Sequence, residues 1–198
     1  MANALSASVL QEAIWKSTGS NVWIKRVALV VLGIAVLALS AKLKVAVPGS
    51  PVPVTMGTFA VLSIGAAYGP RLGLVTVLGY MLLGAVGVAV FAGESAGIVY
   101  MQGGTGGYLL GYVLATIALG AFARKGWDRN ILMMAVAMIV GNLLIYVPGL
   151  LWLNGFAASW AQTFEWGLTP FVIGDLMKLA LAALLFPAIW KLVGKARS

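Results

Sequence analysis

Two residues of opposite charge, Asp175 and Lys178, lie inside a long apolar segment near the C-terminal end of the chain. Placing an ionised side chain at the centre of a bilayer costs roughly 2.5–3.5 kcal/mol even on lenient insertion scales, so such residues are rare and typically functional. A spacing of three puts both on one helical face, where each offsets the charge of the other. The pair is consistent with two interpretations, a polar binding site for a ligand or an ion pair that fixes helix packing.

Asn142 and Tyr146 form a second polar pair, four residues apart on one face of the preceding apolar segment. The amide of Asn142 needs hydrogen-bond partners in a membrane, and either a ligand or a neighbouring helix supplies them. Tyr146 either lines a site or packs in the core. The glycine-rich run 102–108 lets the backbone approach a ligand and frees amides near the start of the next predicted helix. A turn without a ligand is the alternative interpretation of this run.

Residue types that are missing from the sequence restrict the chemistry further. The chain has no cysteine and no histidine, which excludes disulfides, zinc sites built on these residues, and Ser-His-Asp or Cys-His nucleophiles. It also lacks the G-x-x-x-x-G-K-[ST] run of nucleotide-binding P-loops. An enzyme would have to use Asp, Lys, Tyr, Ser or Thr alone. We therefore expect no catalytic residues, no metal and no cofactor.

The composition predicts an all-α membrane protein. Of the 198 residues, 62% are apolar and 9% are charged, whereas soluble domains carry about 25% charged residues. Thirteen basic residues oppose five acidic ones. In a soluble protein this excess would suggest nucleic acid, but here the cations lie at the ends of apolar runs, as the positive-inside rule predicts. We expect lipid around the chain and no nucleic-acid partner.

Hydropathy predicts six spans, because a helix needs about 20 mostly apolar residues to cross the hydrocarbon. The predicted spans are residues 27–41, 54–68, 72–91, 106–123, 131–151 and 170–192. Pro48, Pro51 and Pro53 separate the first two spans, and Gly69-Pro70 marks the turn after the second. We therefore expect a single transmembrane domain, with a six-helix bundle over residues 25–193 and a cytosolic or interfacial segment over residues 1–24.

The distribution of cations predicts the orientation. Ten cations fall on the side of the termini: Lys16, Lys25, Arg26, Arg71, Arg124, Lys125, Arg129, Lys191, Lys195 and Arg197. The other side has Lys42 and Lys44. Because cations accumulate in cytoplasmic loops, both termini are predicted to be cytosolic. The sixth helix then enters from outside, which places Asp175 about 8 Å and Lys178 about 12 Å below the outer boundary.

Four separated motifs resemble those of a known family. They are the proline-rich run 51–58, the turn 69–73, the glycine-rich run 103–108, and the Asp175 and Lys178 pair. Together they are similar to the BioY family, the biotin-specific substrate-binding (S) components of energy-coupling-factor transporters, and the resemblance extends over about residues 25–191. It implies a six-helix membrane bundle that captures biotin and works with a transmembrane coupling (T) subunit and two cytosolic ATPase subunits.

The resemblance also implies roles for individual residues. Asp175 would accept hydrogen bonds from the ureido N–H groups of biotin, and Lys178 would donate to the ureido carbonyl. An alternative orientation pairs Lys178 with the biotin carboxylate. The other implied ligand contacts are Asn142, Tyr146, Gly103, Gly104, Thr105, Val52 and Val54.

The implied function is uptake of biotin across the inner (cytoplasmic) membrane. The small chain, with no internal repeat, favours a module that works with partners. A stand-alone secondary carrier of biotin or a related vitamin is the alternative.

Overall fold

The structure is a computed structural model that describes residues 8–15, 19, 21–93 and 96–195. Over these residues, five helices are long and apolar enough to cross a membrane: α3 (Asn21–Lys42), α4 (Gly57–Ala85), α6 (Gly106–Arg124), α7 (Ile131–Leu153) and α9 (Val172–Lys195). The shorter helices are α2 (Leu10–Ile14), α5 (Gly97–Gln102), η1 (Trp127–Arg129) and α8 (Trp160–Gly167). A two-residue strand β1 (Lys44–Val45) pairs with β2 (Val54–Thr55) in antiparallel orientation.

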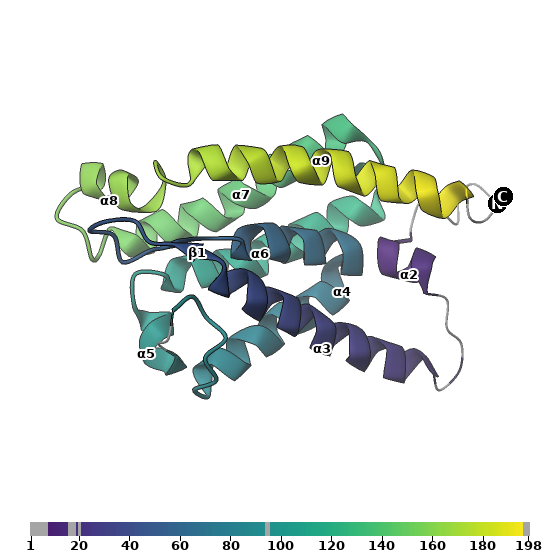
Figure 1. The fold of residues 1–198 in the computed structure, drawn as a ribbon, viewed down its shortest axis with the longest axis horizontal. Helices are drawn as coiled ribbons and strands as arrows, with labels where there is room; N and C mark the ends of the chain where they lie inside the picture. The colour runs from purple at the N-terminus through teal and green to yellow at the C-terminus, as the bar shows by residue number, and fades with distance from the viewer. Residues whose placement is uncertain (1–7, 16–18, 20, 94–95, 196–198) are drawn as a thin grey trace.

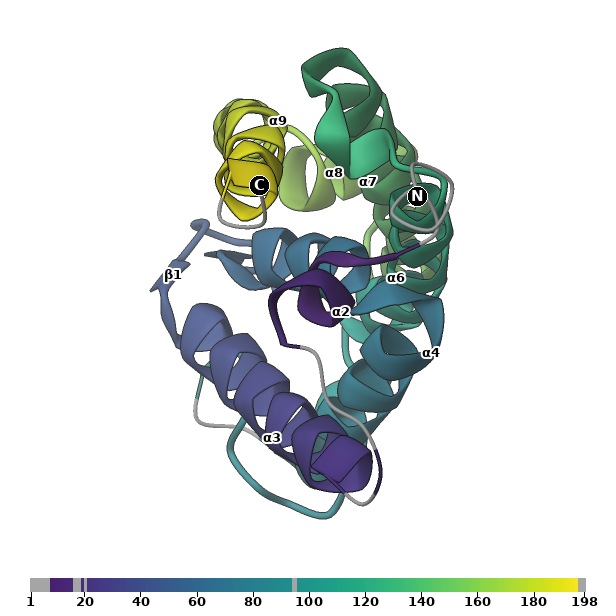
Figure 2. The same ribbon diagram turned by 90° about the vertical axis from the view of Figure 1, so that its right-hand side faces the viewer.

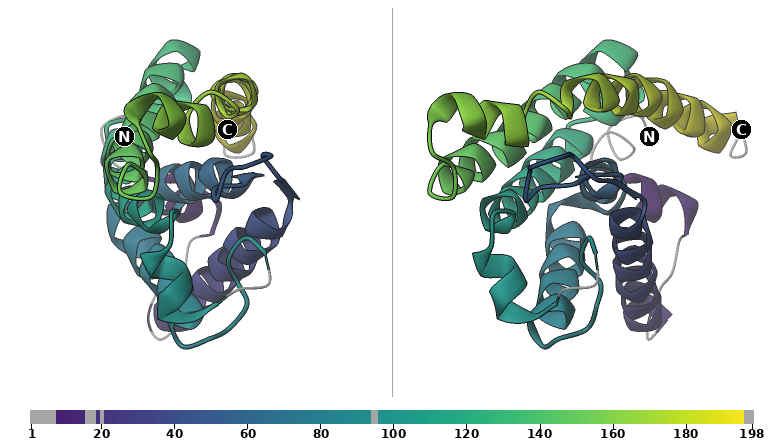
Figure 3. Two further views of the ribbon diagram at one scale, coloured as in Figure 1. Left: turned by 90° about the vertical axis from the view of Figure 1, so that its left-hand side faces the viewer. Right: turned by 60° about the vertical axis from the view of Figure 1, so that its left-hand side comes forward.

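The long helices form one bundle, with α5, α8 and the β1–β2 hairpin at one end and α2 at the other (Figure 1). Seen end-on, α3 packs along α4 on one side and α9 packs along α7 on the other (Figure 2). The left view of Figure 3 shows the opposite end, where the segment between α3 and α4 runs across the molecule. The chain is therefore a multi-pass membrane protein made mostly of helices, as predicted.

The predicted second and third spans are wrong in their bounds, but the predicted turn between them is confirmed. Helix α4 is broken at Gly69, whose φ of 80° and ψ of 174° lie in a region that glycine adopts readily. The two arms fold back on each other, because a methyl group on Gly73 would lie 3.5 Å from the Cα of Gly65. On a straight helix, residues eight apart are about 12 Å apart. Residues 54–55 form β2 and residues 86–93 form a loop, so neither extends a span.

The helix near the N-terminus is part of the bundle rather than a separate tail. Val9 and Ala13 are buried, and Val9 lies against the Gly69 turn of α4. Glu12 forms an ion pair with Arg124 at the end of α6, with an N–O distance of 2.8 Å. The Lys25 ammonium donates to the carbonyl oxygen of Gln11 in α2 and to that of Trp15, which follows α2. Residues 9–14 therefore tie α3, α4 and α6 together at this end.

Several of the predicted inner-side cations gather at the end that carries α2. The indole Nε1 of Trp190 donates to Asp128 Oδ2 at 2.6 Å, and the guanidinium of Arg129 lies 4.0 Å from the centre of the Trp190 ring. These contacts hold the last turns of α9 against η1. Lys16 and Arg197 of the predicted set, and the side chain of Lys195, lie outside the described residues.

Glycines let α6 and α7 approach closely. A methyl group on Gly111 would lie 2.6 Å from the Cα of Ile145, and one on Gly107 would lie 2.2 Å from the carbonyl oxygen of Pro148. Both contacts are with backbone atoms, so the helices would have to separate to make room. The spacing of four places both glycines on the same face of α6.

This packing predicts the effect of a small substitution. We expect Gly111→Ala to lower the free energy of unfolding by about 1–3 kcal/mol, the usual cost of overpacking a tight contact. Gly194→Ala in α9 is the matched control, since a methyl group there would meet nothing within 4 Å. Thermal unfolding of the purified protein in detergent measures both. Equal melting temperatures for the two variants would contradict the close α6–α7 contact.

Candidate substrate-binding site

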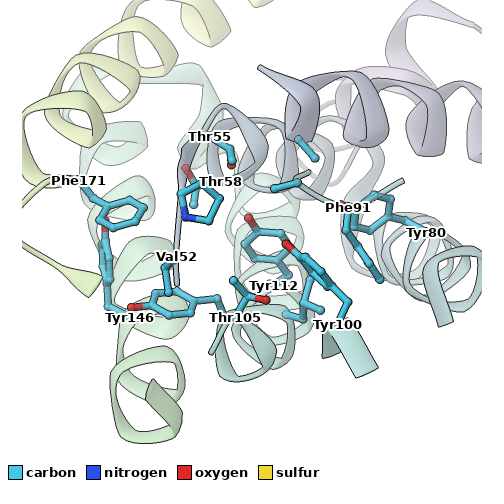
Figure 4. Close-up of a pocket in the computed structure, with 15 residues that line it drawn as sticks. Val52, Thr55, Thr58, Tyr80, Phe91, Tyr100, Thr105, Tyr112, Tyr146 and Phe171 are labelled. Carbon is cyan, nitrogen blue, oxygen red and sulfur yellow. The ribbon is translucent and has the colours of Figure 1, made fainter. Parts of the chain in front are cut away.

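A pocket opens at the end of the bundle that carries α5 and the β1–β2 hairpin. Its empty volume is about 560 Å³, a value that includes open solvent at the mouth. The lining comes from the long helices α3, α4, α6 and α7, from α5, and from segments between helices: Ala41, Val52, Pro53, Thr55, Thr58, Tyr80, Phe91, Ala92, Tyr100, Thr105, Tyr108, Leu109, Tyr112, Tyr146 and Phe171. Figure 4 shows that Tyr146 and Phe171 lie at one end, and Tyr80 and Phe91 at the other.

Aromatic rings form the walls at both ends of the pocket. Tyr146 meets Phe171 and Tyr108 edge to face, each at a centroid distance of 6.3 Å. At the other end, Phe91 stacks on Tyr100 with the centroids 4.7 Å apart. Gly84 leaves room for Phe91, because a methyl group on it would lie 2.0 Å from the ring. Such walls suit an apolar ring or chain, while the tyrosine and threonine hydroxyls supply polar contacts.

Asp175 and Lys178 lie near the start of α9, and both are buried. The Lys178 ammonium donates to Asp175 Oδ1 at 2.8 Å, to the Thr55 carbonyl oxygen at 2.8 Å and to Thr58 Oγ1 at 3.0 Å. An ammonium has three donors, so all of them are used. The second carboxylate oxygen of Asp175 accepts a hydrogen bond from the Tyr146 hydroxyl. Protein groups therefore compensate both charges.

The charged pair lies directly behind the pocket wall. Its three partners Thr55, Thr58 and Tyr146 line the pocket, whereas Asp175 and Lys178 do not. A hydroxyl that donates its proton still has lone pairs to accept with, so Tyr146 can receive an N–H from a ligand without losing Asp175. A ligand that accepts from Lys178 must first replace one of its three hydrogen bonds, whereas Asp175 Oδ2 still has a lone pair for a further donor. The pair therefore fixes a polar patch in an otherwise aromatic wall.

The structure brings three of the residues predicted from sequence to the pocket surface, namely Val52, Thr105 and Tyr146. Val54, in β2, is next to pocket-lining residues but is not in the lining itself. Asn142 lies one turn from Tyr146, and its Nδ2 donates to the Met138 carbonyl oxygen at 3.0 Å. The Oδ1 of Asn142 is buried and has no hydrogen-bond partner among the described residues.

The two predicted glycines pack under the pocket rim. The Gly103 carbonyl oxygen accepts from Trp152 Nε1 at 2.9 Å. Gly104 is buried, and a methyl group on it would lie 3.0 Å from Pro51. Both glycines therefore hold the loop before α6 against its neighbours, and Thr105, which follows them, reaches the pocket.

Sequence reasoning missed most of the aromatic lining. Tyr108 and Tyr112 are four residues apart, as Asn142 and Tyr146 are, so the spacing that singled out the second pair could also have identified the first. Thr55 and Thr58 lie inside the proline-rich run but carry no charge to single them out. Phe91 had no local signal, because a loop places it in the pocket.

Comparisons with known proteins agree with this geometry. A family model described as the BioY family matches residues 9–195. The chain belongs to the BioY family. A relative from Pyrococcus horikoshii, named probable biotin transporter BioY, is 36% identical over 161 residues, which cover 81% of this chain and 93% of the relative. Biotin transporter BioY of Thermotoga maritima is 34% identical over 148 residues, covering 75% and 86% of the two chains.

A solved structure shares the fold of this BioY-family chain. It is a crystal structure of the S-component for biotin from an ECF-type ABC transporter, with a TM-score of 0.77. The match covers 88% of this chain and 95% of the other at 20% sequence identity. The fold of an S component is thus shared over nearly the whole length.

The buried ion pair predicts strongly non-additive effects on stability. Lys178→Met leaves the Asp175 carboxylate buried without its cation, and we expect a loss of about 3–5 kcal/mol. Adding Asp175→Asn removes that unpaired charge, so the double variant should unfold at a higher temperature than Lys178→Met alone. The control is Arg124→Gln, which breaks the more exposed pair with Glu12 and should cost less than about 1 kcal/mol. Additive losses in the double variant would contradict the coupling.

Proposed function

We propose that this BioY-family protein captures biotin on the outer side of the cytoplasmic membrane as the S component of an energy-coupling-factor transporter. The names of its relatives as biotin transporters and the fold shared with an S-component for biotin support this function. The observation that carries it is the pocket wall in which the Asp175 and Lys178 pair fixes Tyr146 and Thr58. Because these relatives are named as transporters, they also argue against a catalytic function.

The chemistry of biotin fits this wall. Its ureido ring has two N–H donors and one carbonyl acceptor, its second ring is a thioether, and its valerate chain ends in a carboxylate. Asp175 and the Tyr146 oxygen accept from the ureido N–H groups, and Lys178 donates to the carbonyl after exchanging one present partner. Phe171 and Tyr108 pack against the rings.

The remaining predicted contacts complete the proposed site. Asn142 extends the polar patch along α7, where its buried Oδ1 has no hydrogen-bond partner among the described residues. Five residues that line the pocket or lie next to its lining cover the ligand at the pocket mouth: Val52, Val54, Gly103, Gly104 and Thr105.

The proposed topology has six crossings and cytosolic termini. The arms of α4 on either side of Gly69 run back along each other, which supports counting them as separate crossings. Lys25, Arg124 and Arg129 gather at the end with α2, and the positive-inside rule assigns that end to the cytosol. The pocket then faces outward. Release inward requires the coupling subunit and two ATPases, and biotin uptake in cells lacking the ATPases would instead favour a stand-alone carrier.

Binding of biotin to the purified protein tests the proposal. We expect tight binding by the wild type, and weakening by about tenfold or more in Asp175→Asn and Tyr146→Phe, because each loses a hydrogen bond of the charged cluster. Tyr68→Phe is the matched control, since Tyr68 lies outside the pocket lining. Isothermal titration gives the affinities, and melting temperatures report folding. Failure of the wild type to bind biotin would reject the function, whereas unchanged affinity in both variants would remove the cluster from the site.

A further inference from the structure

Lys42 lies at the rim of the pocket, far along the chain from the buried charged pair. It is the last residue of α3 and follows Ala41, which lines the pocket. Its ammonium donates to the Gly93 carbonyl oxygen at 2.5 Å, and Gly93 follows another lining residue, Ala92. Lys42 therefore connects the end of α3 with the loop after α4, two neighbouring parts of the rim.

Lys44 reaches the same point from the β1–β2 hairpin. Its cross-strand partner is Thr55, and residues directly opposite each other in an antiparallel pair carry their side chains on one face. Thr55 lines the pocket, so the face shared with Lys44 is the pocket face. A methyl group on Gly93 would lie 3.6 Å from Lys44 Nζ. The two ammonium groups thus converge on Gly93.

The positive charges of Lys42 and Lys44 differ from that of Lys178, because a carboxylate of the described residues pairs with Lys178 only. Among the described residues, the ion pairs are Glu12–Arg124 and Asp175–Lys178, so neither rim lysine is neutralised by a described carboxylate. Both side chains are exposed. Lys178, in contrast, has all three donors occupied by protein groups. An anionic group on a ligand can therefore pair with the rim lysines without breaking an ion pair of the described residues, which do not include Glu94 after Gly93, whereas at Lys178 it must displace a protein group.

We propose that Lys42 and Lys44 form a subsite for the carboxylate of the substrate. This rests on the proposed function, and it fixes the direction of the ligand: the uncharged polar head lies near Tyr146 and Asp175, and the acidic tail lies at the rim beside Gly93. Ala41, Phe91 and Ala92 line the pocket on the rim side, where an alkyl chain would pass. The site selects ligands with a neutral hydrogen-bonding head and a carboxylate at the far end.

A neutral analogue of biotin separates this subsite from the rest of the pocket. The experiment measures the affinities of biotin and biotinamide for the full chain in non-ionic detergent without anionic lipid, at low ionic strength. We expect the wild type to prefer biotin by about three- to tenfold, because exposed ion pairs contribute modestly and are screened by salt. Lys42→Gln/Lys44→Gln should abolish this preference and leave the affinity for biotinamide unchanged. Glutamine keeps an N–H donor for the Gly93 carbonyl.

The matched control is Lys125→Gln/Lys191→Gln, which removes the same charge from the other end of the bundle and should leave the preference intact. An unchanged preference in Lys42→Gln/Lys44→Gln would overturn the subsite while biotin binding stands. Equal losses of biotin and biotinamide in that variant would also overturn it, since the lysines would then act on pocket shape. If the wild type binds neither compound, the proposed function itself fails and the subsite with it.

Discussion

The need to compensate two buried charges organises the pocket end of this protein. Asp175 and Lys178 cannot reach bulk water from their place in α9, and removing a charge from water costs several kcal/mol per ion. Their compensation requires groups from outside α9. Thr55 supplies one from β2, Thr58 supplies one from the start of α4, and Tyr146 supplies one from α7. The ion pair therefore sets where three separate segments meet, and the polar patch of the pocket is a consequence of that meeting.

The broken helix α4 provides the second constraint. Thr58 lies in the arm before Gly69 and Tyr80 in the arm after it, yet both line the pocket. On a straight helix they would be roughly 33 Å apart. The positive φ of Gly69 reverses the chain, and Gly120 on α6 leaves space for the turn, since a methyl group there would lie 2.3 Å from the Pro70 nitrogen. Backbone conformation at one residue thus joins the polar patch to the aromatic end.

Apolarity predicted the long helices well but not where they end. Residues 86–93 are as apolar as the span they follow, yet Gly87 and Gly93 have φ values of 101° and 95°, which lie outside the right-handed helical region. Hydropathy reports that a segment avoids water, and an apolar loop meets that condition as a helix does. In the site, too, some features could be predicted from the sequence and others could not. The charged pair was evident from sequence because its burial is costly, while its compensating hydroxyls at Thr55 and Thr58 are common residues whose role depends on tertiary contacts.

The saturated charged cluster also decides how affinity and specificity divide within the pocket. A ligand head that accepts from Lys178 replaces an existing hydrogen bond, so the net gain from that exchange is small. Burial of apolar rings against Phe171, Tyr108 and Phe91 must then supply most of the binding free energy. The polar patch contributes selectivity, because a head that cannot restore the exchanged bond leaves a buried charge uncompensated. Exposed lysines at the mouth act mainly on encounter and orientation, since water screens them. A pocket built this way discriminates strongly beside the charged pair and attracts at the rim that carries the lysines.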